Sequence, residues 1–192
     1  MQKPVSLIVI VMLAASALAA LPAAVPRKSP EFTISEPSGK TTMLSSLRGK
    51  VVVMEFLFTK SEHCLRVAKT LNKLHGELGP RGFQPVGVVF GPNADEQFVT
   101  YMVDYLKLAY PVGYTTSANV DTYLGRTGNE ILNIPQVVVI DRAGMIRAAS
   151  GRKGGDPKLE DENYLRNLID GLLKEVAPAA SAKKKVTSQP KR

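Results

Sequence analysis

A mostly apolar run leads almost directly into an amphipathic helix, and this junction constrains the fold more than any other part of the chain. The run covers residues 51–58, is β-branched at its start and is apolar at nearly every position. Such a run is typical of a central strand that is covered on both faces. After Ser61, apolar residues recur at helical spacing until Gly79 and Pro80 stop the helix. The junction therefore predicts a strand followed by a helix.

Strand and helix patterns alternate along the rest of the chain. In chain order we expect a hairpin of strands 32–34 and 42–44, a strand at 83–90, a helix at 95–106, a strand at 110–114, a helix at 119–124, strands at 136–140 and 145–149, and a helix at 160–176. This alternation predicts an α/β sandwich with a mixed central sheet, whose closing strand pair is antiparallel.

The 192 residues divide into three parts. Residues 1–24 combine Lys3, a charge-free apolar run and a small-residue cleavage pattern at Ala19, which predicts a signal peptide, with an uncleaved N-terminal anchor as the alternative. Residues 31–176 form one domain of ordinary size. Residues 177–192 are low in large apolar residues, which predicts a disordered basic tail. The expected localisation is periplasmic or secreted, or membrane-anchored if the leader is kept.

The net charge of +8 belongs mostly to the ends of the chain. Lys3 carries one positive charge, and the tail carries five, on Lys183, Lys184, Lys185, Lys191 and Arg192. Removing these six charges from +8 leaves only +2 for the body. A body so close to neutral gives no reason to expect nucleic-acid binding. Weak contact of the tail with anionic lipid or other envelope polymers is the remaining expectation.

Cys64 is the only cysteine of the chain, so no disulfide can form within one molecule. An exported domain with one cysteine depends on an ordinary hydrophobic core. One cysteine and two histidines fall short of a zinc site, and no metal or other cofactor is predicted. The thiol is either an inert buried residue or a reactive monothiol, and the protein is either a monomer or a Cys64-linked dimer.

Four stretches, within about residues 32–176, resemble the AhpC/TSA (redoxin) and TlpA-type thioredoxin-like proteins. They are Phe32-Thr33-Ile34 with residues 44–50, the tetrapeptide Ser61-Glu62-His63-Cys64, Tyr110-Pro111-Val112, and Ile134-Pro135 with residues 137–144. The resemblance implies a thioredoxin-like α/β/α sandwich with an N-terminal β-hairpin extension. It also implies a cis-proline at Pro135, beside a peptide-binding edge that includes Ile134. Ser61 stands where the family has the first of two active-site cysteines, so the active site is degenerate.

The candidate catalytic residues are Cys64 and Ser61. Serine cannot replace the missing redox group, but it is a good N-cap for the following helix. His63 and Lys60 are candidate binding residues: Lys60 would favour a thiolate electrostatically, whereas His63 leaves the helix in a different direction from its neighbour Cys64. Thioredoxins often bury a carboxylate behind the active site as a proton acceptor. Glu55 is the candidate here, and an edge-facing or paired side chain is the alternative.

Three functions compete, and an oxidoreductase is the leading enzyme class. The first is an exported thiol oxidoreductase of antioxidant type, in which Cys64 reacts with thiols or disulfides of exported proteins and an external thiol reductant releases the product. The second is a redox-inactive module that binds peptides or proteins. The third is a one-cysteine, peroxiredoxin-like peroxidase. Pro135 stands where that family has an arginine, and Arg126 and Arg142 are the spare arginines.

Overall fold

The computed structural model describes residues 25–92, 94–128, 131–151 and 157–176. The predicted leader or anchor and the predicted tail lie outside them. The strands are β1 (Arg27–Lys28), β2 (Thr33–Ser35), β3 (Thr41–Met43), β4 (Val51–Leu57), β5 (Phe83–Val89), β6 (Val112–Tyr114), β7 (Gln136–Ile140) and β8 (Met145–Ala149). The helices are α1 (Glu62–Leu78), α2 (Glu96–Leu106), α3 (Ser117–Leu124), α4 (Pro157–Glu160) and α5 (Glu162–Lys174), with 3-10 turns η1 (Leu44–Leu47) and η2 (Gly79–Arg81).

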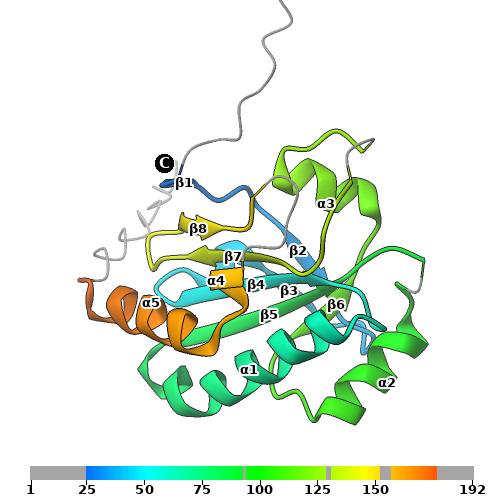
Figure 1. The fold of residues 1–192 in the computed structure, drawn as a ribbon, viewed down its shortest axis with the longest axis horizontal. Helices are drawn as coiled ribbons and strands as arrows, with labels where there is room; N and C mark the ends of the chain where they lie inside the picture. The colour runs from blue at the N-terminus through cyan, green and yellow to red at the C-terminus, as the bar shows by residue number, and fades with distance from the viewer. Residues whose placement is uncertain (1–24, 93, 129–130, 152–156, 177–192) are drawn as a thin grey trace, which may run out of the picture.

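A six-stranded sheet in the order β1-β8-β7-β4-β5-β6 forms the centre of the fold (Figure 1). β4 pairs in parallel with β5 and antiparallel with β7, so the sheet is mixed. Every residue of β4 is buried, as its apolar run predicts. β2 and β3 pair separately as the predicted hairpin. The hairpin lies close against β6, because a Cβ built on Gly113 would lie 2.4 Å from the carbonyl oxygen of Ser35.

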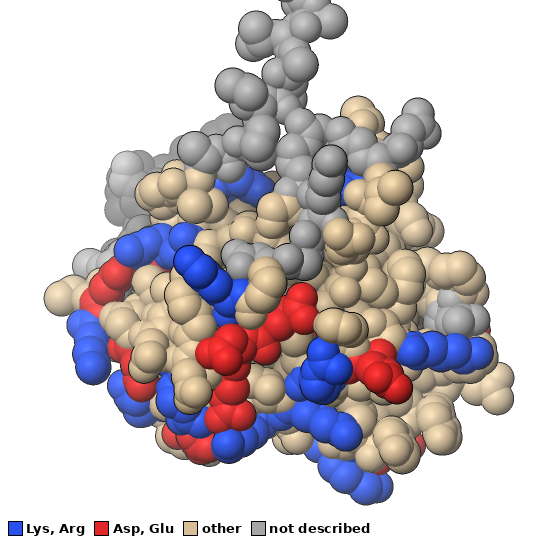
Figure 2. Space-filling view, in the orientation of Figure 1, with Lys and Arg blue, Asp and Glu red and all other residues tan. Residues whose placement is uncertain are grey.

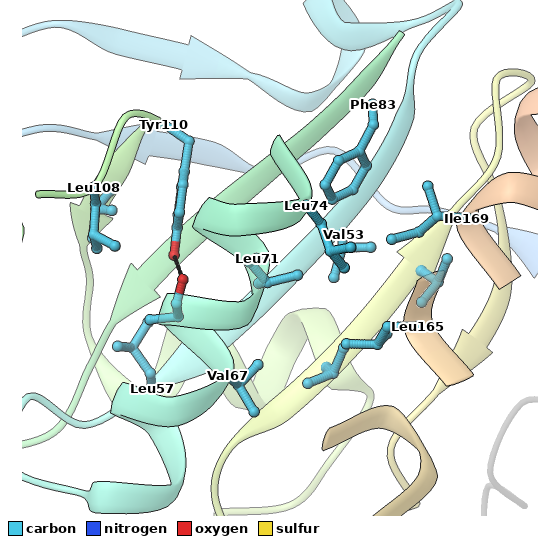
Figure 3. Packing of buried hydrophobic residues seen from close by; sticks show 14 of the residues in the cluster. Val53, Leu57, Val67, Leu71, Leu74, Phe83, Leu108, Tyr110, Leu165 and Ile169 are labelled. Carbon is cyan, nitrogen blue, oxygen red and sulfur yellow. Dashed lines mark hydrogen bonds between the residues drawn. The ribbon is translucent and has the colours of Figure 1, made fainter. Parts of the chain in front are cut away.

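Helices cover both faces of the sheet, which confirms the predicted thioredoxin-like sandwich with its N-terminal hairpin. Side chains of α1, α2, α4 and α5 share one buried cluster with one face of β4, and we call this cluster the α1-side core. Residues of η1, α3 and the hairpin share a second cluster with the other face. In Figure 3, Leu71 and Leu74 of α1 and Leu165 and Ile169 of α5 lie around Val53 of β4. Burying each such side chain contributes about 1.5–3 kcal/mol.

Ion pairs join α1 and its following turn to α5 at the surface. Lys73 lies 2.7 Å from Glu162, Arg81 lies 2.6 Å from Asp170, and Arg166 contacts Glu77. Figure 2 shows the resulting mixture of acidic and basic side chains over these helices. Exposed pairs of this kind add little stability each, roughly 0–1 kcal/mol. Burial of the apolar faces therefore holds α1 and α5 on the sheet.

The closing helix predicted at 160–176 corresponds to α5 (Glu162–Lys174), but it begins two residues later than predicted, and the short helix α4 (Pro157–Glu160) before it was not predicted. Asp161 has an extended backbone, and its carboxylate accepts a hydrogen bond from the N–H of Tyr164 at 2.8 Å. An aspartate in this position starts a new helix. The later start leaves Glu160 at the end of α4, outside α5. β1 was not predicted, since two polar residues carry no alternating pattern.

No helix within the described parts of residues 25–176 is long and apolar enough to cross a membrane.

Candidate functional site

Ser61 caps the N-terminus of α1, as the sequence predicts. Its backbone is extended, and its hydroxyl accepts a hydrogen bond from the N–H of Cys64 at 3.4 Å. This bond satisfies one of the free donors of the first helical turn and stabilises the helix by about 1 kcal/mol. The cap fixes Cys64 in the first turn of α1, on the side that faces the sheet.

The Cys64 side chain lies in the α1-side core and is 0% exposed. Burial raises the pKa of its thiol to about 11; hydrogen bonding with Ser61 and the Phe58 backbone lowers the pKa, and the charges of Glu55 and Glu160 raise it again. A helix N-terminus normally favours a thiolate, but here burial outweighs that effect. At pH 7 only about one thiol in ten thousand is ionised.

Glu55 lies in the middle of β4 and is 0% exposed. Strand alternation puts it on the same face as Val53 and Leu57, which belong to the α1-side core. Neither carboxylate oxygen has a hydrogen-bond partner in the part of the chain that the structure describes, so the paired and edge-facing alternatives fail there. Burial, and next the charge of Glu160, raise the pKa of Glu55 well above its usual value. Glu55 is therefore a buried carboxyl that favours its protonated form.

Two residues at this site were missed by the sequence analysis. Tyr110 donates a hydrogen bond from its hydroxyl to the carbonyl oxygen of Ala68 at 3.3 Å (Figure 3). Burial, and next the charge of Glu55, raise its pKa. Glu160 is the last residue of α4, and its charge raises the pKa of both Glu55 and Cys64. We call Glu55, Cys64 and Glu160 the acidic cluster.

His63 points to solvent, with a side chain that is 62% exposed. Its Nδ1 lies 3.2 Å from Oε2 of Glu160 and 3.0 Å from Nη2 of Arg66. His63 is thus joined to the acidic cluster through Glu160 instead of forming a pair with its neighbour Cys64. No resemblance or motif pointed to this contact, because it joins positions 97 residues apart.

Lys60 lies at the surface, with its ammonium group 5.2 Å from the centre of the Phe98 ring on α2. Beside it opens a hollow of about 280 Å³, which is lined by Phe58, Thr59, Lys60, Ser61, Phe90 and Pro92. The hollow has aromatic walls and a polar rim at the N-terminus of α1. It can hold one side chain of a bound peptide.

Pro135 and Ile134 lie at the same end of the sheet as Ser61. The pairing of Phe56 with Gln136 puts Pro135 beside the end of β4, from which the chain continues to Ser61. The peptide bond between Ile134 and Pro135 is cis, and Pro135 is buried. Ile134 is half-buried and contacts both apolar clusters. The fold thus brings the candidate binding residues to one edge, next to the α1 N-terminus.

The two spare arginines are engaged elsewhere. Nε of Arg126 donates to a carboxylate oxygen of Asp121 at 3.2 Å. The Arg142 guanidinium donates to the carbonyl oxygens of Arg81 and Glu175. Arg142 follows β7, whose last residue pairs near the start of β4, whereas Ser61 follows the end of β4. Arg142 therefore lies at the opposite end of the sheet from Cys64.

Comparison with curated proteins finds no matching sequence. Several solved structures share the fold at low sequence identity. A thiol:disulfide interchange protein of the thioredoxin family from Chlorobium tepidum TLS is 22% identical, with a TM-score of 0.64 over 78% of this chain and 98% of that chain. The thioredoxin domain of thiol-disulfide oxidoreductase BVU-2223 from Bacteroides vulgatus is 20% identical, with a TM-score of 0.63 over 79% of this chain and 99% of that chain.

A secreted Mycobacterium tuberculosis disulfide oxidoreductase, homologous to E. coli DsbE, is 16% identical, with a TM-score of 0.56 over 73% of this chain and 96% of that chain. These identities show the fold alone. The family assignment comes from the sequence, because the model of the AhpC/TSA family matches residues 25–149. That match spans most of the described domain, from β1 to the end of β8. The chain therefore belongs to the AhpC/TSA family.

Proposed function

We propose that this protein is an exported thioredoxin-fold thiol oxidoreductase, in which Cys64 reacts as a single thiol and Glu55 accepts its proton. The observation that carries the proposal is the buried carboxyl of Glu55, which has no hydrogen-bond partner among the described residues and lies on the same core face as the thiol. An unpaired buried polar group costs roughly 1–3 kcal/mol. Proton transfer to and from Cys64 would be a function for the Glu55 carboxyl, whose burial destabilises the fold.

The proposed reaction is thiol–disulfide exchange. In molecules whose Glu55 is ionised, the Cys64 S–H proton passes to the Glu55 carboxylate, and the sulfur attacks a disulfide of a partner protein. The partner's S–S bond breaks, one partner sulfur leaves as a thiolate, and a mixed disulfide with Cys64 forms. An external thiol then attacks the mixed disulfide and restores Cys64, because Ser61 has no sulfur to do so.

The buried thiol sets the condition for this reaction. With 0% exposure, Cys64 meets neither a partner disulfide nor the thiol of a second chain until the first turn of α1 moves. The Ser61 cap and the His63–Glu160 contact are two of the interactions that hold this turn. Opening by local motion, without global unfolding, is therefore part of the proposal.

The test uses 5,5′-dithiobis(2-nitrobenzoate), which releases a coloured thiolate when it forms a mixed disulfide. We expect the folded protein to release one equivalent faster than it unfolds globally, and Cys64→Ser to release none. Glu55→Gln should slow the release at least roughly tenfold, since it removes the proton acceptor. Glu96→Gln, at an exposed position of α2, is the matched control and should react like the parent protein. Release at the global unfolding rate would reject the proposal.

A redox-inactive binding module is the second candidate. It is favoured by the complete burial of Cys64, its pKa of about 11, and the 280 Å³ hollow beside Ser61. In that case captured exported proteins would bind the Cys64→Ala variant as well as the parent protein. Binding that is lost with the sulfur would instead support the oxidoreductase.

The proposal also covers the localisation of the protein and the roles of its two terminal segments. The leader pattern in residues 1–24 supports a periplasmic or secreted protein, and a retained leader would anchor it. The mass of the mature N-terminus separates these cases. An antioxidant role and weak envelope contact by the basic tail are further proposals; the tail contact would weaken with salt.

A further inference from the structure

His63 joins the first turn of α1 to α4. Its Nδ1 lies 3.2 Å from Oε2 of Glu160, although the two residues are 97 positions apart in the chain. α4 is anchored in the body through Leu159, which is 1% exposed and belongs to the same α1-side core as Cys64. Movement of the first turn away from α4 therefore breaks the His63–Glu160 contact. The inference below rests on this opening, which the proposed function requires.

The same nitrogen of His63 has a second, competing partner. Nη2 of Arg66 lies 3.0 Å from Nδ1. A ring nitrogen either carries a proton and donates or carries a lone pair and accepts, so Nδ1 cannot bond to both partners at once. With a proton on Nδ1, His63 donates to Glu160. Without that proton, Nδ1 accepts from Arg66, and its lone pair then faces a carboxylate that has no proton to donate.

We propose that His63 is a pH-sensitive switch that controls access to Cys64. At acidic pH the imidazolium donates to the Glu160 carboxylate and holds the first turn of α1 against α4. As the pH rises, the ring loses the Nδ1 proton to water, Arg66 donates to Nδ1, and the contact with Glu160 weakens. An imidazole makes this change between about pH 5 and 8, where carboxylates stay ionised. The first turn then opens more often, and Cys64 meets a partner disulfide.

His63 is the group at this contact that titrates in that range. Within the described residues, the other charged side chains beside Arg66 and Glu160 at the meeting point of α1 and α4 are Lys60, Glu62, Lys158 and Asp161. Carboxylates, lysines and arginines keep their charges there. Lys60 lies over the Phe98 ring, and Asp161 caps α5. The other histidine of the chain, His75, lies in the last turn of α1.

The test is hydrogen exchange of the Leu65 backbone amide, followed by NMR on the full chain. The Leu65 N–H donates to the carbonyl oxygen of Ser61 at 2.9 Å, so it exchanges when the first turn of α1 opens. Its protection factor, which divides out the intrinsic pH dependence of exchange, should fall about two- to fivefold between about pH 5.5 and 8, as the loss of an exposed ion pair predicts. His63→Gln and Glu160→Gln should each abolish this fall. Arg66→Ala should keep the amide protected to higher pH, because the competing donor is gone.

Two variants are matched controls. His75→Gln removes the other histidine, and Glu162→Gln removes a nearby carboxylate that pairs with Lys73 and Arg166. Both should keep the pH dependence of the parent protein.

Two results would overturn the switch: a constant Leu65 protection factor in the parent protein, or a fall that persists in His63→Gln. The parent measurement needs no variant to fold. The outcome is separable from that of the proposed function, because exchange at Leu65 is measured without any reaction of Cys64. A pH-dependent opening together with an inert thiol would retain the switch and reject the oxidoreductase.

Discussion

The two faces of β4 differ in kind, although they belong to one strand. One face carries Val52, Met54 and Phe56, which pack with aromatic side chains of the hairpin region and α3. The other face carries Val53 and Leu57, and between them Glu55, which has no hydrogen-bond partner in the described ranges of the chain. Both faces are fully buried. Burial alone therefore does not distinguish the face that stabilises the fold from the face that holds the candidate chemistry.

The two faces differ in whether their buried side chains find packing and hydrogen-bond partners. Phe56 lies 5.7 Å from Phe32 and 5.4 Å from Tyr123, measured between ring centres, in edge-on and tilted contacts. The Tyr123 hydroxyl has its own partner, Ser29, at 2.9 Å. On the opposite face the Glu55 carboxyl has no such partner within the residues that the structure describes. We infer that packing of the aromatic face stabilises β4 enough to offset the free-energy cost of burying the Glu55 carboxyl.

The largest effect is expected from removing the aromatic centre. Phe56→Ala leaves a cavity among well-packed rings and should lower the free energy of unfolding by about 3–5 kcal/mol. Urea unfolding measures this loss. Phe98→Ala, at a half-buried ring on α2, is the control and should cost clearly less. A loss no greater than that of the control would contradict the stabilising role of this face.

The second effect is the alkaline titration of Cys64. Its pKa rises from 9.0 in the unfolded chain to about 11 in the fold. The unfolded state therefore ionises first, so the stability that the neutral thiol contributes is complete below pH 9 and is lost as the pH rises through 11. The loss approaches about 3 kcal/mol. Unfolding curves of Cys64→Ser should lack this component, and identical pH slopes in both proteins would refute it.

The third effect is the removal of the buried carboxyl. Glu55→Met keeps a side chain of similar size without an unpaired polar group, and should raise the free energy of unfolding by about 1–3 kcal/mol at neutral pH. Because the pKa of Glu55 is raised in the fold, its contribution is most favourable below its unfolded pKa and declines as the pH rises through the folded value. The methionine variant should lose that decline. A destabilised variant would mean that Glu55 has a partner.

Much of the fold could be predicted from local patterns. β7 and β8 have the predicted bounds, because the turn between them is set by neighbouring residues: the Asp141 carboxylate accepts from the N–H groups of Ala143 and Met145. Gly144 has φ +78, a backbone conformation that residues with a side chain rarely adopt, so the turn favours glycine. Such signals can be recognised within a few residues.

The site could be predicted only in part. Ser61, Cys64 and Glu55 lie on the junction that the sequence marks out. Whether Cys64 is accessible depends on the packing of α4 and α5 over α1, which the local sequence does not contain. Glu160 could not be found for the same reason, because read locally it is only the first residue of a closing helix.

The smallest expected effect comes from removing the Ser61 N-cap, which tests whether Ser61 acts only on the helix or also on the buried thiol. Ser61→Ala removes an N-cap and should cost about 1 kcal/mol. Thr116→Ala removes the N-cap of α3, whose hydroxyl accepts from the N–H of Asn119 at 3.3 Å, and should cost a similar amount. Only Ser61→Ala should also raise the pKa of Cys64 further, because the Ser61 hydrogen bond lowers it. Alkylation of Cys64 against pH measures this shift. Equal alkylation profiles in both variants would show that Ser61 acts on the helix alone and not on the thiol.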